Sequence, residues 1–542
     1  MKSKKITHKD EMGEKIATGI HEIASIVKRT LGPGGLPILI DREGTAPNGD
    51  PLGPMITKDG VTVASECSSP DPEVDLVIQT VKAICKKTNR IAGDGTTTAI
   101  VLGESILTES LDALKEDKSL NPQLVRESVE AASKQVRELL QKIATPCRDS
   151  KMVEDVATIS ANGDAEIGRV IREAFDAVGA EGVITVDEGY GPQTTIDVVQ
   201  GFQIRRGAEA QDRFFNNIEG TRFECEQPAV ILYDGKIMSY TEILPVLNTI
   251  AGAAAKDGKK GLPPIVLIAH EFSPEVIQFL LIQRNEVALR VCAVKAPHTT
   301  TVRTEMLDDM AVMLGCKRLG NGNESLERAT LDHVGSCERV IVDKYTTTFY
   351  DGDGSEESVI ERVEQLKARR KVAESPYDAS LISDRIASLS QGIAKIGVGG
   401  TTDLEIKERY HRIEDALNAA RAAVEEGIIP GGGVVLARIA HSLQPGDTIG
   451  ERILSRALLA PFNQIVENIS GDPTKILSSE TWPDSIDSPL TYDARNKKIV
   501  NALEAGIIDP VKVTRTALEN ATSIAALLST CGGSIVLLRK QE

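Results

Sequence analysis

The segment Ile91–Thr98, which reads IAGDGTTT, combines residue types that suit phosphate binding. Glycine lets the backbone adopt conformations closed to other residues and lets a ligand approach closely. The first N–H groups of a helix are unpaired and carry partial positive charge, and threonine hydroxyls add further donors. Asp94 would repel phosphate unless a divalent cation stood between them, and Mg²⁺ prefers oxygen ligands. The segment therefore predicts a Mg-nucleotide phosphate site.

An ordinary helix cap explains the same residues without a ligand. Asp and Thr favour the first positions of helices and glycine punctuates turns, so a bare Gly-Asp-Gly would be a cap. Three threonines at the start of a second apolar helix favour the phosphate site instead. The residues of the segment alone leave both interpretations open.

Helical patterns flank this segment on both sides. Apolar residues recur at helical spacing from Val74 to Cys85, and a second apolar run extends from Ala99 to Leu111. The segment is therefore expected to be a helix–loop–helix corner. A second glycine corner, Gly427–Gly433, follows a long predicted helix, Leu404–Val424, which carries Asp415.

Hydrophobic periodicity and turn residues predict the remaining elements. A helix is expected from about Asp10 to Leu31, and Leu36–Asp41 is expected to be a strand. Thr57–Gly60 is predicted to be a turn before a short strand, Val61–Val63. Turn or loop structure is also predicted at residues 45–54 and 158–164, helices at 124–143, 167–178, 243–255, 274–284, 356–374 and 513–528, and strands at 182–186, 229–233, 264–269, 290–294, 392–400 and 534–538.

Length and composition limit the class of protein. A chain of 542 residues can bury several cores, which suggests about three domains. A change to α/β alternation near Gln200 agrees with a domain boundary there. Hydrophobic residues make up 41% and charged residues 26%, as in ordinary globular proteins.

The charge balance disfavours two classes of partner. The net charge is -17 and aromatic residues make up only 3%, so neither a nucleic-acid nor a membrane partner is expected. The start of the chain lacks an apolar signal core, and no apolar run approaches membrane-spanning length. The eight cysteines never form CxxC and are expected to be scattered thiols in a reducing compartment. A cytoplasmic protein is predicted, in the host cytoplasm if a virus encodes it.

Common nucleotide-binding motifs do not explain the phosphate site. The chain has no GxxxxGK[ST], and it has no strand-borne GxGxxG. A larger set of motifs resembles those of the bacterial-type (group I, GroEL-like) 60-kDa chaperonins. The motifs occur in the order that they have in that family and cover nearly the whole chain, which therefore resembles a divergent member of the family. These motifs are Thr30–Pro33, Thr57–Val63, Ala92–Thr98, Thr158–Asn162, Val294–Pro297, Arg412–Leu417, Pro430–Gly433 and Gly506–Arg515.

The resemblance implies a multidomain α+β chaperonin fold. A mostly α-helical equatorial ATP-binding domain would comprise residues 1–142 and 426–542. A small α/β intermediate hinge domain would comprise residues 143–199 and 394–425. An α/β apical polypeptide-binding domain would comprise residues 200–393.

The resemblance also assigns roles at the nucleotide site. It implies Asp59 and Asp415 as the catalytic carboxylates that position or activate water, and Asp94 as the Mg²⁺ ligand. It implies Thr30 and Lys58 as contributors to a K⁺ site. The implied nucleotide-binding residues are Thr30, Leu31, Gly32, Pro33, Lys58, Asp94, Gly95, Thr96, Thr97, Thr98, Gly432, Asp493 and Asp509. Taken alone, Asp415 would be a solvated carboxylate and Asp59 a turn residue.

A polypeptide-binding face is implied by five further residues. Leu244 and Leu247 match one groove helix of the family, and Ile277, Leu281 and Ile282 match the other. Apolar residues at helical spacing are usually core, so burial is the alternative. The family also expects exposed aromatics in residues 207–215, where this chain has Ala208, Asp212 and Arg213 instead, unless Phe214 and Phe215 have shifted register to take that place.

The implied function is that of an ATPase which captures non-native polypeptides and encloses them in a homo-oligomeric, heptameric ring, with a co-chaperonin lid as a further partner. The altered apical residues keep open an alternative, a nucleotide-binding ring scaffold or interaction protein with reduced folding activity. Retention of Asp59, Asp94 and Asp415 disfavours that alternative. A metabolic kinase is disfavoured because no small-substrate site is visible.

Overall fold

The computed structural model describes residues 4–537 except 42–53, 180–181, 190, 200, 211–212, 218–219, 257–261, 288, 299, 321–324, 373–375, 391, 445, 480–481 and 484. The chain forms two compact units with separate hydrophobic cores. Unit 1 comprises Met1–Glu173, Tyr190–Thr194 and Val398–Glu542, and unit 2 comprises Ala174–Gly189 and Thr195–Gly397. The finer division into three domains stays a prediction. Residues 45–53 of the predicted loop lie outside the described residues.

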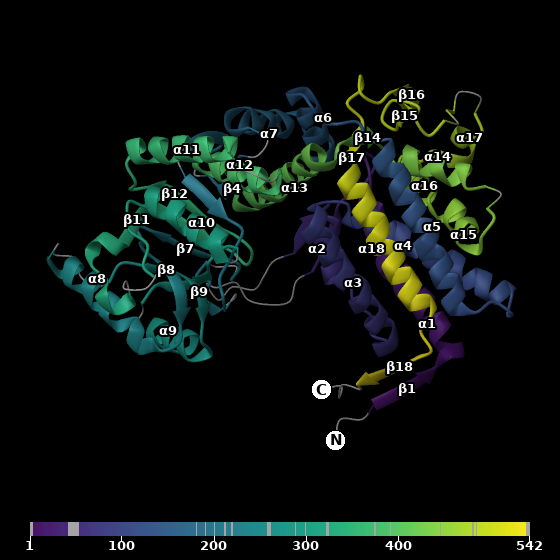
Figure 1. Ribbon diagram of the computed structural model, residues 1–542. Coiled ribbons are helices and arrows are strands. Elements are labelled where there is room, and N and C mark those ends of the chain that lie inside the picture. Colours follow the sequence, from purple (N-terminus) through teal and green to yellow (C-terminus); the bar gives the residue numbers. More distant parts are fainter. Residues whose placement is uncertain are drawn as a thin grey trace. The chain divides into compact units, whose positions relative to one another are not determined.

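The core of unit 1 is built from helices near both ends of the chain. Helix α18 (Val511–Ser529) packs against α3 (Pro72–Ala92), α4 (Thr96–Glu116) and α5 (Pro122–Lys142), and these helices run side by side in Figure 1. Most of α18 is buried. Residues more than 350 positions apart in sequence therefore share one core, with Asn520 donating to Thr88 Oγ1 at 2.9 Å inside it.

Helix α1 (Lys9–Val27) follows the predicted apolar stripe. Met12, Ile16, Ile20, Ile23 and Val27 are each at most 3% exposed, so the prediction of a helix here is confirmed. A 3₁₀ turn, Lys28–Thr30, follows the helix, and Gly32 then adopts a φ of 76°. Few L-residues adopt that conformation, so the glycine redirects the chain.

Seven further helices and four strand pairs complete the described part of unit 1. The remaining helices are α2 (Gly60–Glu66), α6 (Ser150–Ser160), α13 (Asp403–Glu426), α14 (Val434–Ser442), α15 (Ile449–Ala457), α16 (Ala460–Asn468) and α17 (Pro473–Leu477), while α7 (Ala165–Val178) contains a boundary between the units. The antiparallel pairs are β1 (Lys4–His8) with β18 (Gly533–Leu537), β2 (Ile38–Ile40) with β3 (Met55–Thr57), β14 (Ile428–Pro430) with β17 (Ile508–Pro510), and β15 (Leu490–Asp493) with β16 (Lys498–Asn501).

Unit 2 is an α/β structure around a seven-stranded sheet. The strand order is β10 (Val291–Lys295), β9 (Ile265–Phe272), β8 (Ala229–Ile237), β11 (Val334–Val342), β12 (Thr347–Gly352) and β6 (Gly201–Ile204), with β7 (Phe223–Glu226) paired to β11. Strands β8, β9 and β10 are parallel, and their central residues are nearly all buried, as expected for parallel strands. The helices are α8 (Leu244–Lys256), α9 (Pro274–Val287), α10 (Thr300–Met313), α11 (Glu356–Lys371) and α12 (Pro376–Ser390). A second sheet has the order β4 (Val183–Glu188), β13 (Ile393–Val398), β5 (Thr195–Val199).

Two local predictions were wrong. Residues 61–63, predicted to be a strand, begin helix α2, because Asp59 accepts hydrogen bonds from the backbone N–H groups of Val61 and Thr62 and so caps a helix. Residues 158–160, predicted to be a turn, end helix α6, whose buried Val153, Val156 and Ala157 stabilise it through packing. Tertiary contacts and a side-chain cap therefore outweighed local residue preference at both places.

The predicted multidomain α+β fold class is confirmed by these elements. All eight cysteines are free thiols. Burial raises the pKa of several of them, for example that of Cys85 to about 12. None of the helices within the described ranges combines the length and the apolar character that crossing a bilayer requires.

A partly buried charge cluster lies where the two sheets of unit 2 meet. The Asp187 side chain on β4 is only 5% exposed and contacts Arg339 Nη1 at 3.0 Å, Arg222 Nη1 at 3.5 Å and Lys395 Nζ at 3.8 Å. Glu224 pairs with both arginines. Asp187 is therefore the buried anion that neutralises three cations.

We predict that Asp187→Ala destabilises unit 2 by about 3 kcal/mol, because removing one partner of a buried ion pair leaves charges uncompensated. Glu271→Gln is the matched control, because the Glu271–Lys236 pair is exposed on both sides and its loss should cost less than about 1 kcal/mol. Urea unfolding of both variants measures the difference. Equal losses would show that the Asp187 cluster contributes no more than a surface pair.

Candidate functional site

The predicted phosphate corner is a helix–loop–helix turn in unit 1. Helix α3 ends at Ala92, Gly93 and Gly95 adopt φ values of 71° and 83°, and α4 begins at Thr96. Gly95 occupies the N-cap position and has no side chain that could accept a hydrogen bond from the first turn. The first N–H groups of α4 are therefore open to an anion.

Close packing also requires glycine at this corner. A Cβ atom at Gly93 would lie 2.2 Å from Asn418 Cβ on α13, and one at Gly95 would lie 2.7 Å from Val513 Cγ1 on α18. A Cβ atom at Gly60, the first residue of α2, would lie 2.2 Å from Thr97 Oγ1. The start of α4 is therefore enclosed by α2, α13 and α18.

The first two hydroxyl groups of α4 differ in their partners. Thr96 Oγ1 is buried and makes no hydrogen bond within the part of the chain that the structure describes. Thr97 Oγ1 lies 3.5 Å from Thr30 Oγ1, which itself donates to Val27 O at 2.8 Å. A buried hydroxyl without a partner costs free energy, so a ligand that accepts its hydrogen bond would stabilise the site.

Asp94 is held by hydrogen bonds on both carboxylate oxygens. Oδ1 accepts from the backbone N–H of Gly95, and Oδ2 accepts from Ser160 Oγ at 2.9 Å. Burial raises the pKa of Asp94 against the lowering effect of these bonds, and the negative charge of Asp59 raises it further. A cation beside Asp94 would relieve that penalty.

The two predicted catalytic carboxylates have different surroundings. Asp59 caps α2, and its Oδ2 accepts from Thr62 N at 2.8 Å and Thr62 Oγ1 at 2.5 Å. Asp415 lies in the middle of α13. Burial raises its pKa well above the usual range, and the charges of Asp94 and Asp59 raise it further. Asp59 is thus fixed by its own helix, whereas Asp415 is a carboxyl that readily holds a proton.

The second glycine corner brings Asp509 to the same site. Strands β14 and β17 pair Ile429 with Asp509, whose Oδ2 accepts from Gly432 N at 3.1 Å. Gly432 has a φ of 77°, and a Cβ atom there would meet nothing closer than Thr491 Oγ1 at 3.8 Å. Burial raises the pKa of Asp509 to about 6, and the charge of Asp94 contributes to this rise.

Asp493, another predicted nucleotide contact, accepts hydrogen bonds from residues of its own β-hairpin. Its carboxylate accepts from Arg495 N at 3.0 Å, from Asn496 N at 3.1 Å and from Asn496 Nδ2 at 2.6 Å. Arg495 Nη2 in turn donates to Asn162 O at 2.9 Å. The β15–β16 hairpin is thereby attached to the turn that follows α6.

The predicted Thr30–Pro33 segment is fixed from two sides. Asn468 Nδ2 donates to Lys28 O and Leu31 O, both at 2.9 Å, and Lys58 Nζ donates to Gly32 O at 3.3 Å. Burial lowers the pKa of Lys58, and the nearby Arg495 and Arg412 lower it further. The structure thus brings this segment to Lys58 and, through Thr30, to Thr97.

Two positioning residues were missed by sequence reasoning. Ser160 lies within the Thr158–Asn162 motif, which could have drawn attention to it as a partner for Asp94. Asn468 carries no comparable signal, because a single asparagine near the end of an amphipathic helix is common on protein surfaces. The distance of Asn468 from residue 30 in sequence hides the contact.

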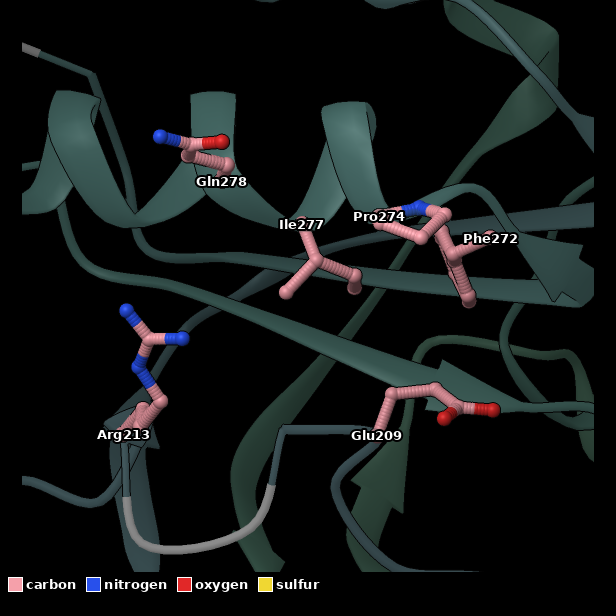
Figure 2. A pocket seen from close by; sticks show the side chains of 6 residues that line it. All are labelled: Glu209, Arg213, Phe272, Pro274, Ile277 and Gln278. Atoms are coloured by element: carbon pink, nitrogen blue, oxygen red, sulfur yellow. The ribbon is translucent and has the colours of Figure 1, made fainter.

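The predicted polypeptide-binding residues of unit 2 divide into two groups. Leu244 and Ile282 are exposed, at 38% and 41%, whereas Leu247 and Leu281 are only 8% and 7% exposed and belong to the core. The expectation that all five form one exposed strip is therefore wrong for Leu247 and Leu281, which pack inward from α8 and α9. Ile277 is partly buried and lines the pocket in Figure 2.

The residues present fit a magnesium–nucleotide ligand. None of the described side chains form a cluster of three or more His, Cys, Asp or Glu groups that could hold a metal ion by themselves. Mg²⁺ commonly uses one or two carboxylates together with water and phosphate oxygens. Asp94, opposite the open start of α4 and the unpartnered Thr96 hydroxyl, suits that arrangement.

Comparison with known proteins gives one family. The model of the TCP-1/cpn60 chaperonin family matches residues 23–244 and 247–531. The chain is similar in structure to the chaperonin gp146 from the bacteriophage EL 2 (Pseudomonas aeruginosa), crystallised in the presence of ATP-BeFx. Crystal form II gives a TM-score of 0.72 at 22% identity and crystal form I gives 0.64 at 21%, each over 99% of both chains. The TM-scores show a shared fold, and at identities this low they show nothing beyond the fold.

We predict that Asp509→Asn stabilises the unliganded protein at neutral pH. A carboxyl whose pKa rises from 3.8 to about 6 on folding lowers stability once ionised, and this loss disappears as the pH falls through 6 toward 4. The free energy of unfolding of the variant should therefore exceed that of the parent by about 1–3 kcal/mol at about pH 7.5, and the two should be equal near pH 4. Urea unfolding at both pH values measures this.

Asp493→Asn is the control of opposite sign. Burial raises the pKa of Asp493, but hydrogen bonds from Asn496 and Arg495 outweigh burial and leave the pKa lowered. That variant should lose stability at neutral pH. A pH-independent effect of Asp509→Asn would contradict the proposed origin of the pKa shift.

Proposed function

Because this chain belongs to the TCP-1/cpn60 chaperonin family, we propose that it is an ATP-dependent chaperonin. In this proposal it captures non-native polypeptides on its apical face and encloses them in a ring-shaped chamber in the cytoplasm. Binding and hydrolysis of Mg-ATP drive the cycle. A ligand that binds one conformation better than another shifts the population between them, and this is how ATP would change the apical face.

The observation that carries the proposal is the convergence of four carboxylates on the open start of α4. The charge of Asp59 raises the pKa of Asp94 and of Asp415, and the charge of Asp94 raises the pKa of Asp415 and of Asp509. Four acids lie beside the first N–H groups of α4 and the buried Thr96 hydroxyl, which has no partner among the described residues. Such a site is incomplete without a cation and a polyanion. Mg-ATP supplies both.

Each residue has a proposed part in hydrolysis. Asp94 would hold Mg²⁺, which neutralises charge on the phosphates when bound. The N–H groups and hydroxyls of Thr96, Thr97 and Thr98 would bind phosphate oxygens. Asp415 would take the proton of the attacking water, because its environment favours the protonated form, and Asp59 would help to position that water.

The remaining nucleotide contacts complete the proposed site. Leu31, Gly32 and Pro33 would cover one side of the nucleotide, and Gly95 would allow phosphate to approach the backbone. Gly432, Asp493 and Asp509 would contact base and ribose. The structures of gp146 with ATP-BeFx support a nucleotide ligand in this fold. A K⁺ site at Thr30 and Lys58 would use oxygen atoms, so Lys58 would contribute its carbonyl rather than its ammonium group.

Assembly into a homo-oligomeric ring is supported by two unfinished strand pairs in unit 1. The facing residues Ile6 and Ile535 of β1 and β18 are 63% and 64% exposed, and the facing residues Leu39 and Ile56 of β2 and β3 are 68% and 65% exposed. Two-stranded sheets are marginally stable alone, and open edges accept further strands. We propose that such edges pair between copies, in a ring of seven by resemblance.

A nucleotide-binding ring scaffold with reduced folding activity is the second candidate. The observation that favours it is the small exposed apolar area on the predicted apical helices, where Leu247 and Leu281 are buried. One experiment separates the two: recovery of a chemically denatured test enzyme, with and without ATP and with and without a small lid protein. ATP-dependent recovery supports the chaperonin, and ATP hydrolysis without recovery supports the scaffold.

We predict that Asp415→Ala slows ATP hydrolysis by about 100-fold or more while nucleotide still binds, because a proton acceptor is lost but the phosphate contacts remain. Asp94→Ala should instead abolish Mg-dependent nucleotide binding. Glu414→Ala, which removes an exposed acid one position away, is the control. Hydrolysis and equilibrium binding are measured separately for each variant. Parental turnover in Asp415→Ala would remove that residue from the mechanism.

We predict that Ile535→Lys weakens assembly, because a charge would have to enter an apolar contact between copies. Leu331→Lys is the control, since Leu331 is 54% exposed and belongs to unit 2 rather than to either of these strand pairs. Mass measurement in solution over a dilution series compares both variants with the parent. Assemblies of unchanged size and stability in Ile535→Lys would exclude this edge from the interface.

A further inference from the structure

Unit 2 contains an open pocket of about 500 Å³ beneath the first turns of α9. Figure 2 shows its lining: Pro274, Ile277 and Gln278 from α9, Phe272 from the end of β9, and Glu209 and Arg213 from the segment opposite. Apolar and charged groups therefore face the same space. The pocket thus differs from the exposed side chains of Leu244 and Ile282, which are apolar only.

The two walls of the pocket are fixed to each other. Arg284 of α9 donates through Nη1 to Arg213 O and through Nη2 to Phe215 O. Glu209 N donates to Ala293 O at 2.9 Å, and Phe214 and Phe215 are buried in the core. The pocket is thus a built feature, with the backbone of Arg213 held at a defined place on its rim.

The charges in the pocket do not cancel. Glu209 Oε1 lies 3.6 Å from Lys295 Nζ, so its charge is compensated from outside the pocket. Arg213 has no carboxylate partner among the residues that the structure describes, and Figure 2 shows its guanidinium extending toward α9 and away from the Glu209 carboxylate. An unpaired arginine beside an apolar wall is complementary to an anion attached to an apolar group.

We propose that this pocket binds an acidic, apolar-containing segment of a client polypeptide. A client carboxylate would pair with Arg213, and a neighbouring apolar side chain would pack against Phe272, Pro274 and Ile277. The Gln278 amide would bind the client backbone. The identity of the segment as part of a client rests on the proposed function. The pocket would then give capture a sequence preference that a purely apolar surface lacks.

A nucleic acid fits this pocket less well than a peptide does. Binding to nucleic acid depends on neutralising several phosphates, whereas Arg213 is the one basic residue among the described residues that line this pocket, in a protein of net charge -17. The apolar wall formed by Phe272, Pro274 and Ile277 has no counterpart on a phosphate backbone. A single carboxylate with an apolar neighbour uses both features.

The test uses the full-length protein and three fluorescent peptides that differ at one position beside a leucine: Glu, Gln or Lys. Fluorescence anisotropy measures their affinities. The Glu peptide should bind at least about tenfold tighter than the Gln peptide, because a charge-assisted pair is lost. Arg213→Glu should reverse the order so that the Lys peptide binds best, and Arg213→Lys should retain much of the preference for Glu. Ile277→Ser should weaken all three.

Arg205→Glu is the matched control, because it makes the same charge change at an exposed arginine that does not line the pocket. It should leave the order of the peptides unchanged. Equal affinity for the Glu and Gln peptides, or the same change from Arg205→Glu as from Arg213→Glu, would overturn the proposal. Displacement of the Glu peptide by an oligonucleotide at equal charge concentration would also overturn it, because it would indicate a general anion site.

Failure of this inference and failure of the proposed function give different results. Capture of denatured enzyme that is unaffected by Arg213→Glu, together with peptides that bind equally, leaves the chaperonin function in place and removes the charge preference. Arg213-dependent peptide binding without any capture or refolding supports the pocket but favours the scaffold function.

Discussion

The proposed nucleotide site depends on how closely helices approach the start of α4. Gly60, Gly93 and Gly95 lie where α2, α13 and α18 close around that helix, and a Cβ atom at any of the three would overlap a neighbour. The absence of side chains brings Asp59, Asp415 and the first turn of α4 to one place. Larger residues would push the helices apart and separate the carboxylates from the first N–H groups of α4.

This close approach has an electrostatic cost that hydrogen bonds to Asp94 and Asp509 offset only in part. Burial and mutual repulsion raise the pKa values of Asp94, Asp415 and Asp509. Lys58 is close, but it donates to Gly32 O rather than to a carboxylate. Repulsion among these carboxylates lowers the stability of the unliganded protein. A cation that binds there relieves the repulsion and therefore stabilises the folded state. The same carboxylates thus account for both metal dependence and proton transfer in the proposed mechanism.

The sequence allowed most of the fold to be predicted, because periodicity records which face of an element is buried. The α1 stripe and the β8 and β9 runs follow that rule. The strand predicted at Val61–Val63 was wrong, because the side chain of Asp59 caps a helix at these residues. Site residues could be named from motifs, but their surroundings could not: Ser160 reaches Asp94 across 66 positions. Exposure of Leu247 and Leu281 was mispredicted because helical spacing does not say which stripe of a two-sided helix faces the core.

The interleaved composition of unit 1 has a consequence for biosynthesis. Helix α18, against which α3, α4 and α5 pack, leaves the ribosome only after nearly all of the chain has been made. The uninterrupted Thr195–Gly397 part of unit 2 emerges earlier and can fold while synthesis continues, since domains generally fold as units. Helices α3, α4 and α5 therefore expose apolar surface until several hundred further residues have been synthesised. Asp415 and Asp509 both belong to the Val398–Glu542 part of unit 1, so a nascent chain cannot assemble the carboxylate site before most of that part has been translated.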